Sequence, residues 1–255
     1  MGSFALWVGF GASLGIWRLA RSVDRQRGEW ANVGLFILLV SLLGARFSYV
    51  LLNQAYFGQH LLEIPMVWLG GLTWPGALSG AFLSRVYLTI HYRSPRTGKI
   101  SPGWLGDRIY PLLPPVVITI WLGCWSSGTG YGAALPTGAW WGVPSPDESG
   151  AVILRWPVQL AAALSLLAFF TLLELRVQPM RPSGRISSLA VLGLLIHLLV
   201  FSFFVADPAP SWNGLRTDTW AALAFLVIFL TFQLTNNLLA RSRQRLRRSV
   251  RYSRS

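Results

Sequence analysis

Charged residues are scarce in this chain of 255 residues: they make up 12% of it, whereas soluble domains usually carry about 25%. Acidic residues are the scarcest, with 9 aspartates and glutamates against 22 lysines and arginines. Hydrophobic residues account for 53% of the chain, and tryptophan occurs 13 times. This composition excludes an ordinary soluble enzyme and a disordered chain, which would be poor in aromatic residues, and it favours a polytopic membrane protein.

Cysteine and histidine are also rare. The single cysteine, Cys124, excludes an internal disulfide framework. The three histidines, His60, His91 and His197, are too scattered along the chain to predict a metal cluster. We therefore expect neither a metal site nor a cofactor.

Apolar runs are long enough to cross a bilayer, whose hydrocarbon core of about 30 Å needs about 20 helical residues. We find seven of them: Phe4–Ala20, Val33–Leu52, Val67–Ile90, Ile109–Ser127, Val152–Leu175, Ser188–Ala206 and Thr219–Ala240. Loop signals rich in proline, glycine and serine separate several of these runs. We predict an all-α membrane protein with about seven transmembrane helices over residues 1–240, followed by a basic tail over residues 241–255.

The positive charges predict the orientation of these spans. Of the 22 lysines and arginines, 19 fall on one alternating set of loops, and the other set holds Arg155 and Arg216 beside five acidic residues. Because cytoplasmic loops carry the excess of positive charge, we place the N-terminus outside and the C-terminus in the cytoplasm. The net charge of +13 then reflects membrane topology, and we predict no nucleic-acid partner because no recognition module accompanies the basic tail.

Several polar residues lie inside the apolar runs. A charge in hydrocarbon costs about 2.5 to 3.5 kcal/mol, so the guanidinium of Arg46 either binds a lipid phosphate or extends to the outer headgroups. Gln159 either bridges two helices or lines a polar cavity. His197 is typical of a hydrogen-bonded packing residue. Two glycine-rich stretches, 70–80 and 123–132, favour close helix packing or a central cavity.

Four segments of the chain share a recognisable pattern. They are Gly44-Ala45-Arg46-Phe47-Ser48-Tyr49-Val50, Gly70-Gly71-Leu72-Thr73-Trp74-Pro75-Gly76, Asp107-Arg108-Ile109-Tyr110-Pro111-Leu112-Leu113-Pro114 and Arg155-Trp156-Pro157-Val158-Gln159-Leu160. In order and spacing, from about residue 4 to residue 240, they resemble the prolipoprotein diacylglyceryl transferase family. The resemblance implies a multi-pass protein of the bacterial plasma (inner) membrane, with phosphatidylglycerol and a lipoprotein precursor as partners.

The resemblance also implies site residues. Arg46, Gln159 and Asp107 match the family's polar motif positions by identity, and they are our candidates for binding a phosphatidylglycerol-like phospholipid. The family's histidine corresponds to Pro75, its signature arginine to Trp121 and a nearby asparagine to Cys124. Neither arginine of the family's sixth helix is present over residues 198–208. We therefore predict no catalytic residue by number.

These substitutions leave two hypotheses open. The first is a divergent transferase which, if active, moves a diacylglyceryl group from phosphatidylglycerol to a lipobox cysteine; each missing transition-state donor costs about 3 to 4 kcal/mol. The second is a non-catalytic lipid-binding or partner-binding membrane protein on the same scaffold. A small transporter is disfavoured, because the sequence shows no internal repeat and no intramembrane pair of carboxylates.

Overall fold

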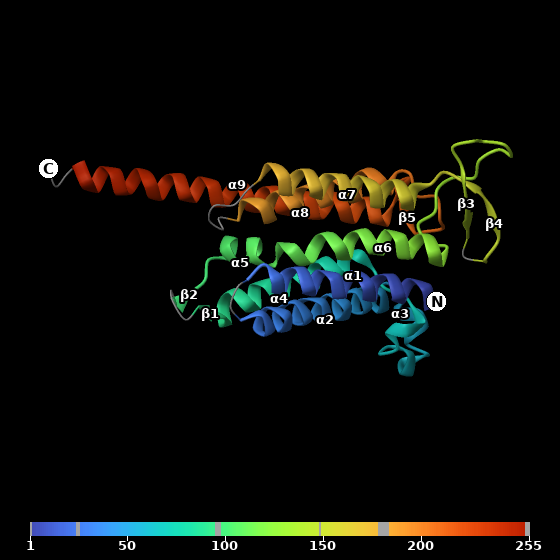
Figure 1. The fold of residues 1–255 in the computed structure, drawn as a ribbon, viewed down its shortest axis with the longest axis horizontal. Helices are drawn as coiled ribbons and strands as arrows, with labels where there is room; N and C mark the ends of the chain where they lie inside the picture. The colour runs from blue at the N-terminus through green and yellow to red at the C-terminus, as the bar shows by residue number, and fades with distance from the viewer. Residues whose placement is uncertain (1, 24–25, 95–97, 148, 178–183, 253–255) are drawn as a thin grey trace.

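The computed structural model describes residues 2–23, 26–94, 98–147, 149–177 and 184–252, and its long elements are helices lying side by side (Figure 1). The long helices are α1 (Gly2–Arg21), α2 (Arg27–Leu52), α4 (Trp74–His91), α5 (Pro102–Ile109), α6 (Leu113–Ser127), α7 (Val158–Arg176), α8 (Arg185–Ser202) and α9 (Thr217–Tyr252). Short helical turns are α3 (Gln54–Phe57), η1 (Leu61–Glu63), η2 (Val67–Leu69) and η3 (Tyr110–Leu112). Three antiparallel hairpins connect helices: β1 (Arg93–Ser94) with β2 (Gly98–Lys99), β3 (Val143–Pro146) with β4 (Val152–Arg155), and β5 (Ser211–Trp212) with β6 (Leu215–Arg216).

The predicted all-α, polytopic class is confirmed. Within the described residues, six helical stretches are long and apolar enough to cross a membrane: Ser3–Arg21, Arg27–Leu52, Pro102–Ser127, Val158–Arg176, Arg185–Ser202 and Thr217–Asn236. The third expected span corresponds to α4, which has 18 residues and runs alongside α2 (Figure 1). Because α4 is not among the six, the count of seven spans stays a prediction.

Two expected spans start too early, and the prediction of their first residues is wrong. Gly70 and Gly71 have φ values of 90° and 71°, which are left-handed, so the chain turns there and α4 begins only at Trp74. Pro75, in the first turn of α4, fits a helix start because its missing N–H is not needed there. Val152–Arg155 forms β4 instead of the first turn of a span, and α7 starts after Pro157.

The two ends of the bundle differ (Figure 1). We call the end that carries α3 and the β3–β4 hairpin the hairpin end. The opposite end, which carries α5 and the short β1–β2 hairpin, is the α5 end. The N-terminus lies at the hairpin end and α9 extends past the α5 end, as an odd number of crossings requires. That the hairpin end faces outward stays a prediction from charge, and so does the division at residue 240, because α9 continues as helix through Tyr252.

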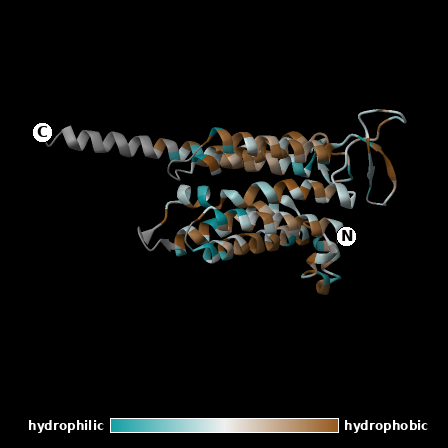
Figure 2. Ribbon diagram, viewed as in Figure 1, coloured by the Kyte–Doolittle hydropathy of each residue, from teal (hydrophilic) through white to brown (hydrophobic). Residues whose placement is uncertain are grey.

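Two clusters of buried side chains form the core. One packs Leu19, Trp30 and Ile37 around Leu112 of η3, and the other packs Leu166 and other residues of α7 and α8 around Tyr110. The 3₁₀ turn η3 therefore contributes to both clusters and joins the N-terminal helices to the C-terminal helices. Apolar residues also cover the outside of the bundle (Figure 2), as expected where lipid is the solvent.

Helices α2 and α4 approach each other closely at three glycines. A Cβ atom at Gly76 would overlap the carbonyl oxygen of Gly44, one at Gly44 would overlap that of Gly76, and one at Gly80 would overlap that of Val40. Small residues let helix backbones pack in lipid, where no hydrophobic effect drives helices together. This contact fixes α4 beside α2 although α4 contains Arg85.

We predict that Gly76→Ala destabilises the protein by about 1 to 3 kcal/mol, because the added methyl group forces α2 and α4 apart. The measurement is the free energy of unfolding in detergent micelles. Gly9→Ala in α1 is the matched control, since its Cβ meets no atom within 4 Å and it should not destabilise. Equal losses in both variants would contradict the close packing.

Candidate functional site

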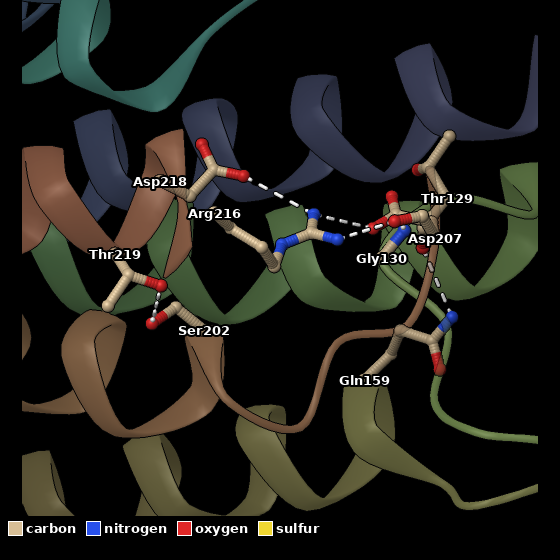
Figure 3. Close-up of polar contacts among 8 residues, drawn as sticks. All are labelled: Thr129, Gly130, Gln159, Ser202, Asp207, Arg216, Asp218 and Thr219. Atoms are coloured by element: carbon tan, nitrogen blue, oxygen red, sulfur yellow. Dashed lines mark hydrogen bonds and ion pairs between the residues drawn. The ribbon is translucent and has the colours of Figure 1, made fainter. Parts of the chain in front are cut away.

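Polar side chains converge at the hairpin end, where α6 and α8 end and α7 and α9 begin (Figure 3). We call Thr129, Gly130, Gln159, Asp207, Arg216 and Asp218 the Asp207 cluster. The local sequence explains this meeting point. Gly128, with φ of 70°, ends α6 in the left-handed conformation, and the β5–β6 hairpin returns the chain from α8 into α9.

Asp207 is the centre of the cluster. Its carboxylate accepts a 2.9 Å hydrogen bond from the backbone N–H of Gly130 and pairs with Arg216 at 2.7 Å. Arg216 also donates to the backbone carbonyl of Asp207 and lies 3.4 Å from the carboxylate of Asp218. Both members of the Asp207–Arg216 pair are mostly buried, and the pair lies within the α8–α9 connection. The hydrogen bond from Gly130 to Asp207 ties the end of α6 to this connection.

Gln159 lies at the edge of the cluster. Its side chain is fully buried, and its amide nitrogen donates to the carbonyl of Thr129 at 3.1 Å. Of the two alternatives left open by the sequence, this is the bridge between two helices, here α7 and the end of α6. A buried 2.9 Å hydrogen bond from Thr219 to Ser202 links α9 to α8 nearby (Figure 3).

Arg155 is a second buried arginine on the hairpin side. Its side chain is 9% exposed, and its guanidinium lies 4.1 Å from the ring centroid of Tyr131 and 3.3 Å from the carboxylate of Asp147. A hydrogen bond from the hydroxyl of Ser149, backbone N–H groups and the charge of Arg155 lower the pKa of Asp147, so this carboxylate stays ionised. Arg155 thus contacts the ring of Tyr131, and Arg216 is linked to the neighbouring Gly130 through Asp207.

Sequence reasoning missed the two arginines as site residues. It counted both as loop charges, although Arg155 also opens the fourth motif segment. The Nε–H groups of both side chains are buried and have no hydrogen-bond partner among the described residues. One signal was present: Arg216 lies between two aspartates, Asp207 and Asp218, in a segment otherwise poor in charge.

Arg46 occupies a different position from the Asp207 cluster. It is 6% exposed, and its guanidinium donates to the carbonyl oxygens of Glu63, Ile64, Gly70 and Gly71, the Ile64 bond measuring 2.8 Å. The same group lies over the rings of Phe57 and Tyr49. Arg46 therefore holds the segment between α2 and α4 in place through its backbone.

Asp107 lies at the α5 end. Its carboxylate accepts hydrogen bonds from the N–H of Gly184 at 2.6 Å and from the N–H and hydroxyl of Ser187, both at 2.9 Å. It thus caps the start of α8, where the helix dipole favours an anion. The structure does not bring Arg46, Gln159 and Asp107 together, and their lipid-binding role stays a prediction.

Two other residues weighed in the sequence, His197 and Cys124, lie on α8 and α6, the helices that end at the Asp207 cluster. His197 lies 3.3 Å from the hydroxyl of Ser165 and makes an edge-on contact with Trp121. Cys124 is half-buried, one turn from the end of α6. Within the described ranges, no group of three or more histidine, cysteine, aspartate or glutamate side chains could hold a metal ion.

The fold and the cluster define a class: a polytopic membrane protein with a buried polar site at one end of its helix bundle. A family model, prolipoprotein diacylglyceryl transferase, matches residues 1–235, and the chain belongs to this family. The resemblance predicted from the four sequence segments is thereby confirmed.

Curated relatives agree with this assignment. The chain is 31% identical over 178 residues to the phosphatidylglycerol–prolipoprotein diacylglyceryl transferase of Bordetella avium, covering 66% of this chain and 64% of that one. It is 33% identical over 211 residues to the protein of that name from Oleidesulfovibrio alaskensis, covering 78% and 73%. For the Geobacter sulfurreducens protein the identity is 30% over 201 residues, covering 76% and 74%. The chain thus spans less than two thirds of the Bordetella relative and about three quarters of the other two.

We predict that Arg46→Met releases the segment between α2 and α4, because four carbonyl groups lose their donor and each buried unpaired group costs about 1 to 3 kcal/mol. Hydrogen–deuterium exchange over residues 58–71 is the measurement, and faster exchange is expected there. Arg176→Met, an exposed arginine at the end of α7, is the control. Unchanged exchange in Arg46→Met would show that the arginine does not hold the segment.

We predict that Asp207 and Arg216 are coupled more strongly than Arg18 and Glu174, an ion pair of 2.6 Å with more exposed side chains. A double-mutant cycle with Asp207→Asn and Arg216→Met should give a coupling free energy above the 0.2 to 1 kcal/mol typical of exposed pairs, about 1 to 3 kcal/mol. The same cycle on Arg18 and Glu174 is the comparison, and equal couplings would contradict a structural role for the cluster.

Proposed function

We propose that this protein binds a phosphatidylglycerol-like phospholipid at the hairpin end of the bundle, on the outer side of a bacterial plasma membrane. Its proposed reaction is the transfer of the diacylglyceryl group to the cysteine thiol of a lipobox in a prolipoprotein. Membership of the transferase family over residues 1–235 carries the proposal. The names of the relatives supply the donor and the acceptor.

The chemistry sets two demands on the site. A bond forms between the cysteine sulfur and a glyceryl carbon, the bond from that carbon to the phosphate oxygen breaks, and glycerol phosphate leaves with the bonding electrons. Cations are needed to hold the phosphate and stabilise the leaving group. The thiol, whose pKa is about 8.5 in the free amino acid, must lose its proton to become the nucleophile.

Arg155 and Arg216 are the side chains that support the first demand. Both are largely buried at the hairpin end, and each has an Nε–H group without a partner among the described residues. Arg155 contacts Tyr131, and Arg216 is linked to Gly130 through Asp207. Arginine suits a phosphate because its planar group donates two parallel hydrogen bonds. Gln159, our sequence candidate in the same cluster, adds a polar group next to Thr129.

The carboxylates beside these arginines limit the strength of the proposed site. Arg155 is paired with Asp147, and Arg216 with Asp207, so a phosphate competes with two anions that are already bound. The positive potential at the site is therefore weaker than two unpaired arginines would give. We expect lipid binding of modest affinity and a slow transfer.

A second candidate function is a non-catalytic protein that binds lipid or a partner on the same frame. The packing of Trp121 favours it. This residue, which takes the position of the family's signature arginine, is surrounded by His197 and Phe201 at ring-centroid distances of 6.0 and 5.9 Å. An aromatic cluster there replaces a cation, and it supports binding or packing more than phosphate chemistry.

The deciding experiment incubates the protein, reconstituted with phosphatidylglycerol, with a lipobox peptide, and detects the thioether by mass spectrometry. We expect slow product formation that falls about 100-fold or more in Arg155→Gln, the size of effect seen when one transition-state donor is lost. Arg176→Gln is the control and should not change the rate.

Native mass spectrometry of the same variants measures lipid retention separately. Retention of phosphatidylglycerol without any thioether product, with the lipid lost in Arg155→Gln, would support the non-catalytic candidate. If the protein neither retains phosphatidylglycerol nor forms the thioether product, both candidate functions are overturned. Arg46→Ala and Asp107→Asn test the other two sequence candidates, and unchanged retention in either variant would remove that residue from the lipid-binding site.

A further inference from the structure

Arg108 is a half-buried cation at the α5 end, opposite to the Asp207 cluster. It belongs to α5, and its Cζ atom lies 5.4 Å from the ring centroid of Trp104, one turn earlier on the same helix. Helical side chains point toward the N-terminus of their helix, as this contact shows. Since α6 continues from α5 toward the hairpin end (Figure 1), Arg108 points away from the middle of the bundle.

Three aromatic rings indicate the depth of this arginine. Trp104 packs against Trp30, in the first turn of α2, at a ring-centroid distance of 5.9 Å. Trp30 also contacts Tyr92, the residue that follows α4, at 5.8 Å. Tryptophan and tyrosine concentrate where lipid headgroups meet hydrocarbon. The guanidinium stacked on Trp104 therefore lies close to the headgroups of the leaflet at the α5 end.

The described carboxylates at this end are bound elsewhere. Glu29 accepts a hydrogen bond from a tyrosine hydroxyl, and Asp107 caps the start of α8. Glu174 is bound by an arginine at 2.6 Å and by a tyrosine hydroxyl at 3.1 Å. Within the described ranges, the charge of Arg108 is therefore not neutralised by an ion pair.

The hydrogen-bonding groups of Arg108 are also unused. Its Nε–H is buried and has no partner among the residues that the structure describes, and its two terminal nitrogens are not buried. Arg85, at the same end, differs because it donates to the carbonyl oxygen of Pro102 at 2.9 Å and lies within reach of the charge of Asp107. An acceptor from outside the described chain can thus reach the terminal nitrogens of Arg108.

We infer that Arg108 binds the phosphate group of an anionic phospholipid in the leaflet at the α5 end. A charge next to hydrocarbon is costly unless an anion compensates it, and the protein supplies none among its described residues. The planar guanidinium presents two parallel donors that match two phosphate oxygens, and Trp104 holds it in place by a cation–π contact. Basic sites between helix ends are typical of headgroup binding. The site lies at the opposite end from Arg155 and Arg216, so the inference does not depend on the proposed function.

Hydrogen–deuterium exchange over residues 102–110 tests the inference. The full chain in detergent micelles is titrated with phosphatidylglycerol, and phosphatidylcholine, whose headgroup has no net charge, is the reference lipid. We expect phosphatidylglycerol to slow exchange in this segment at lower concentrations than phosphatidylcholine. In Arg108→Gln, the phosphatidylglycerol concentration that gives half of the protection should rise about tenfold or more, because a charge-assisted hydrogen bond is lost. Arg176→Gln, which removes an exposed arginine at the same end, is the control and should leave that concentration unchanged.

A second variant and a second probe complete the test. Arg108→Lys keeps the charge but not the two parallel donors, so it should lose part of the protection, and it serves if Arg108→Gln does not fold. Inorganic phosphate, added without lipid, should not slow exchange; protection by it would assign the site to a free anion and overturn the lipid assignment. Equal protection by the two lipids, unchanged protection in both Arg108 variants, or an equal loss in Arg176→Gln would also overturn the inference.

Discussion

In a bilayer, polar groups of the chain must find their partners within the protein, and Arg46 shows how strongly this constraint shapes the molecule. Arg46 belongs to the apolar helix α2, and a charge on such a helix is costly unless it is bound. The binding partners are four backbone carbonyls from a segment that has little regular structure of its own. One side chain thus satisfies its own charge and orders the chain between α2 and α4 at the same time.

The same requirement explains the distribution of the other polar residues. Asp207 binds a backbone N–H and a guanidinium, Asp107 binds the start of α8, and Gln159 binds the end of α6. Each of these groups joins elements that are distant in the sequence. The polar residues of this family member therefore hold the frame together, and two buried arginines, Arg155 and Arg216, retain donors beyond those used for that purpose.

Two positions that the resemblance singles out contribute to the frame. Trp121 packs against His197 and Phe201, and Pro75 begins α4, so the positions where the resemblance implies an arginine and a histidine serve packing and helix initiation. Besides Arg46, two further buried cations at the hairpin end, Arg155 and Arg216, come from β4 and from the β5–β6 hairpin. A transferase and a lipid-binding protein share these features. They differ in whether a basic group can take the proton from the lipobox cysteine thiol.

The sequence by itself determined the membrane class, most span positions and the family, because hydropathy and motif order are properties of contiguous residues. Local errors came from glycine and proline: the positive φ values at Gly70 and Gly71 delay α4, and the residues before Pro157 form a strand although they are apolar. Only the tertiary structure decided what the polar residues bind. Arg46 and Asp107 look equivalent as motif matches, yet their partners lie at opposite ends of the bundle. The pairing of Arg155 with Tyr131 and of Asp207 with Gly130 depends on contacts between distant segments, which no local pattern contains.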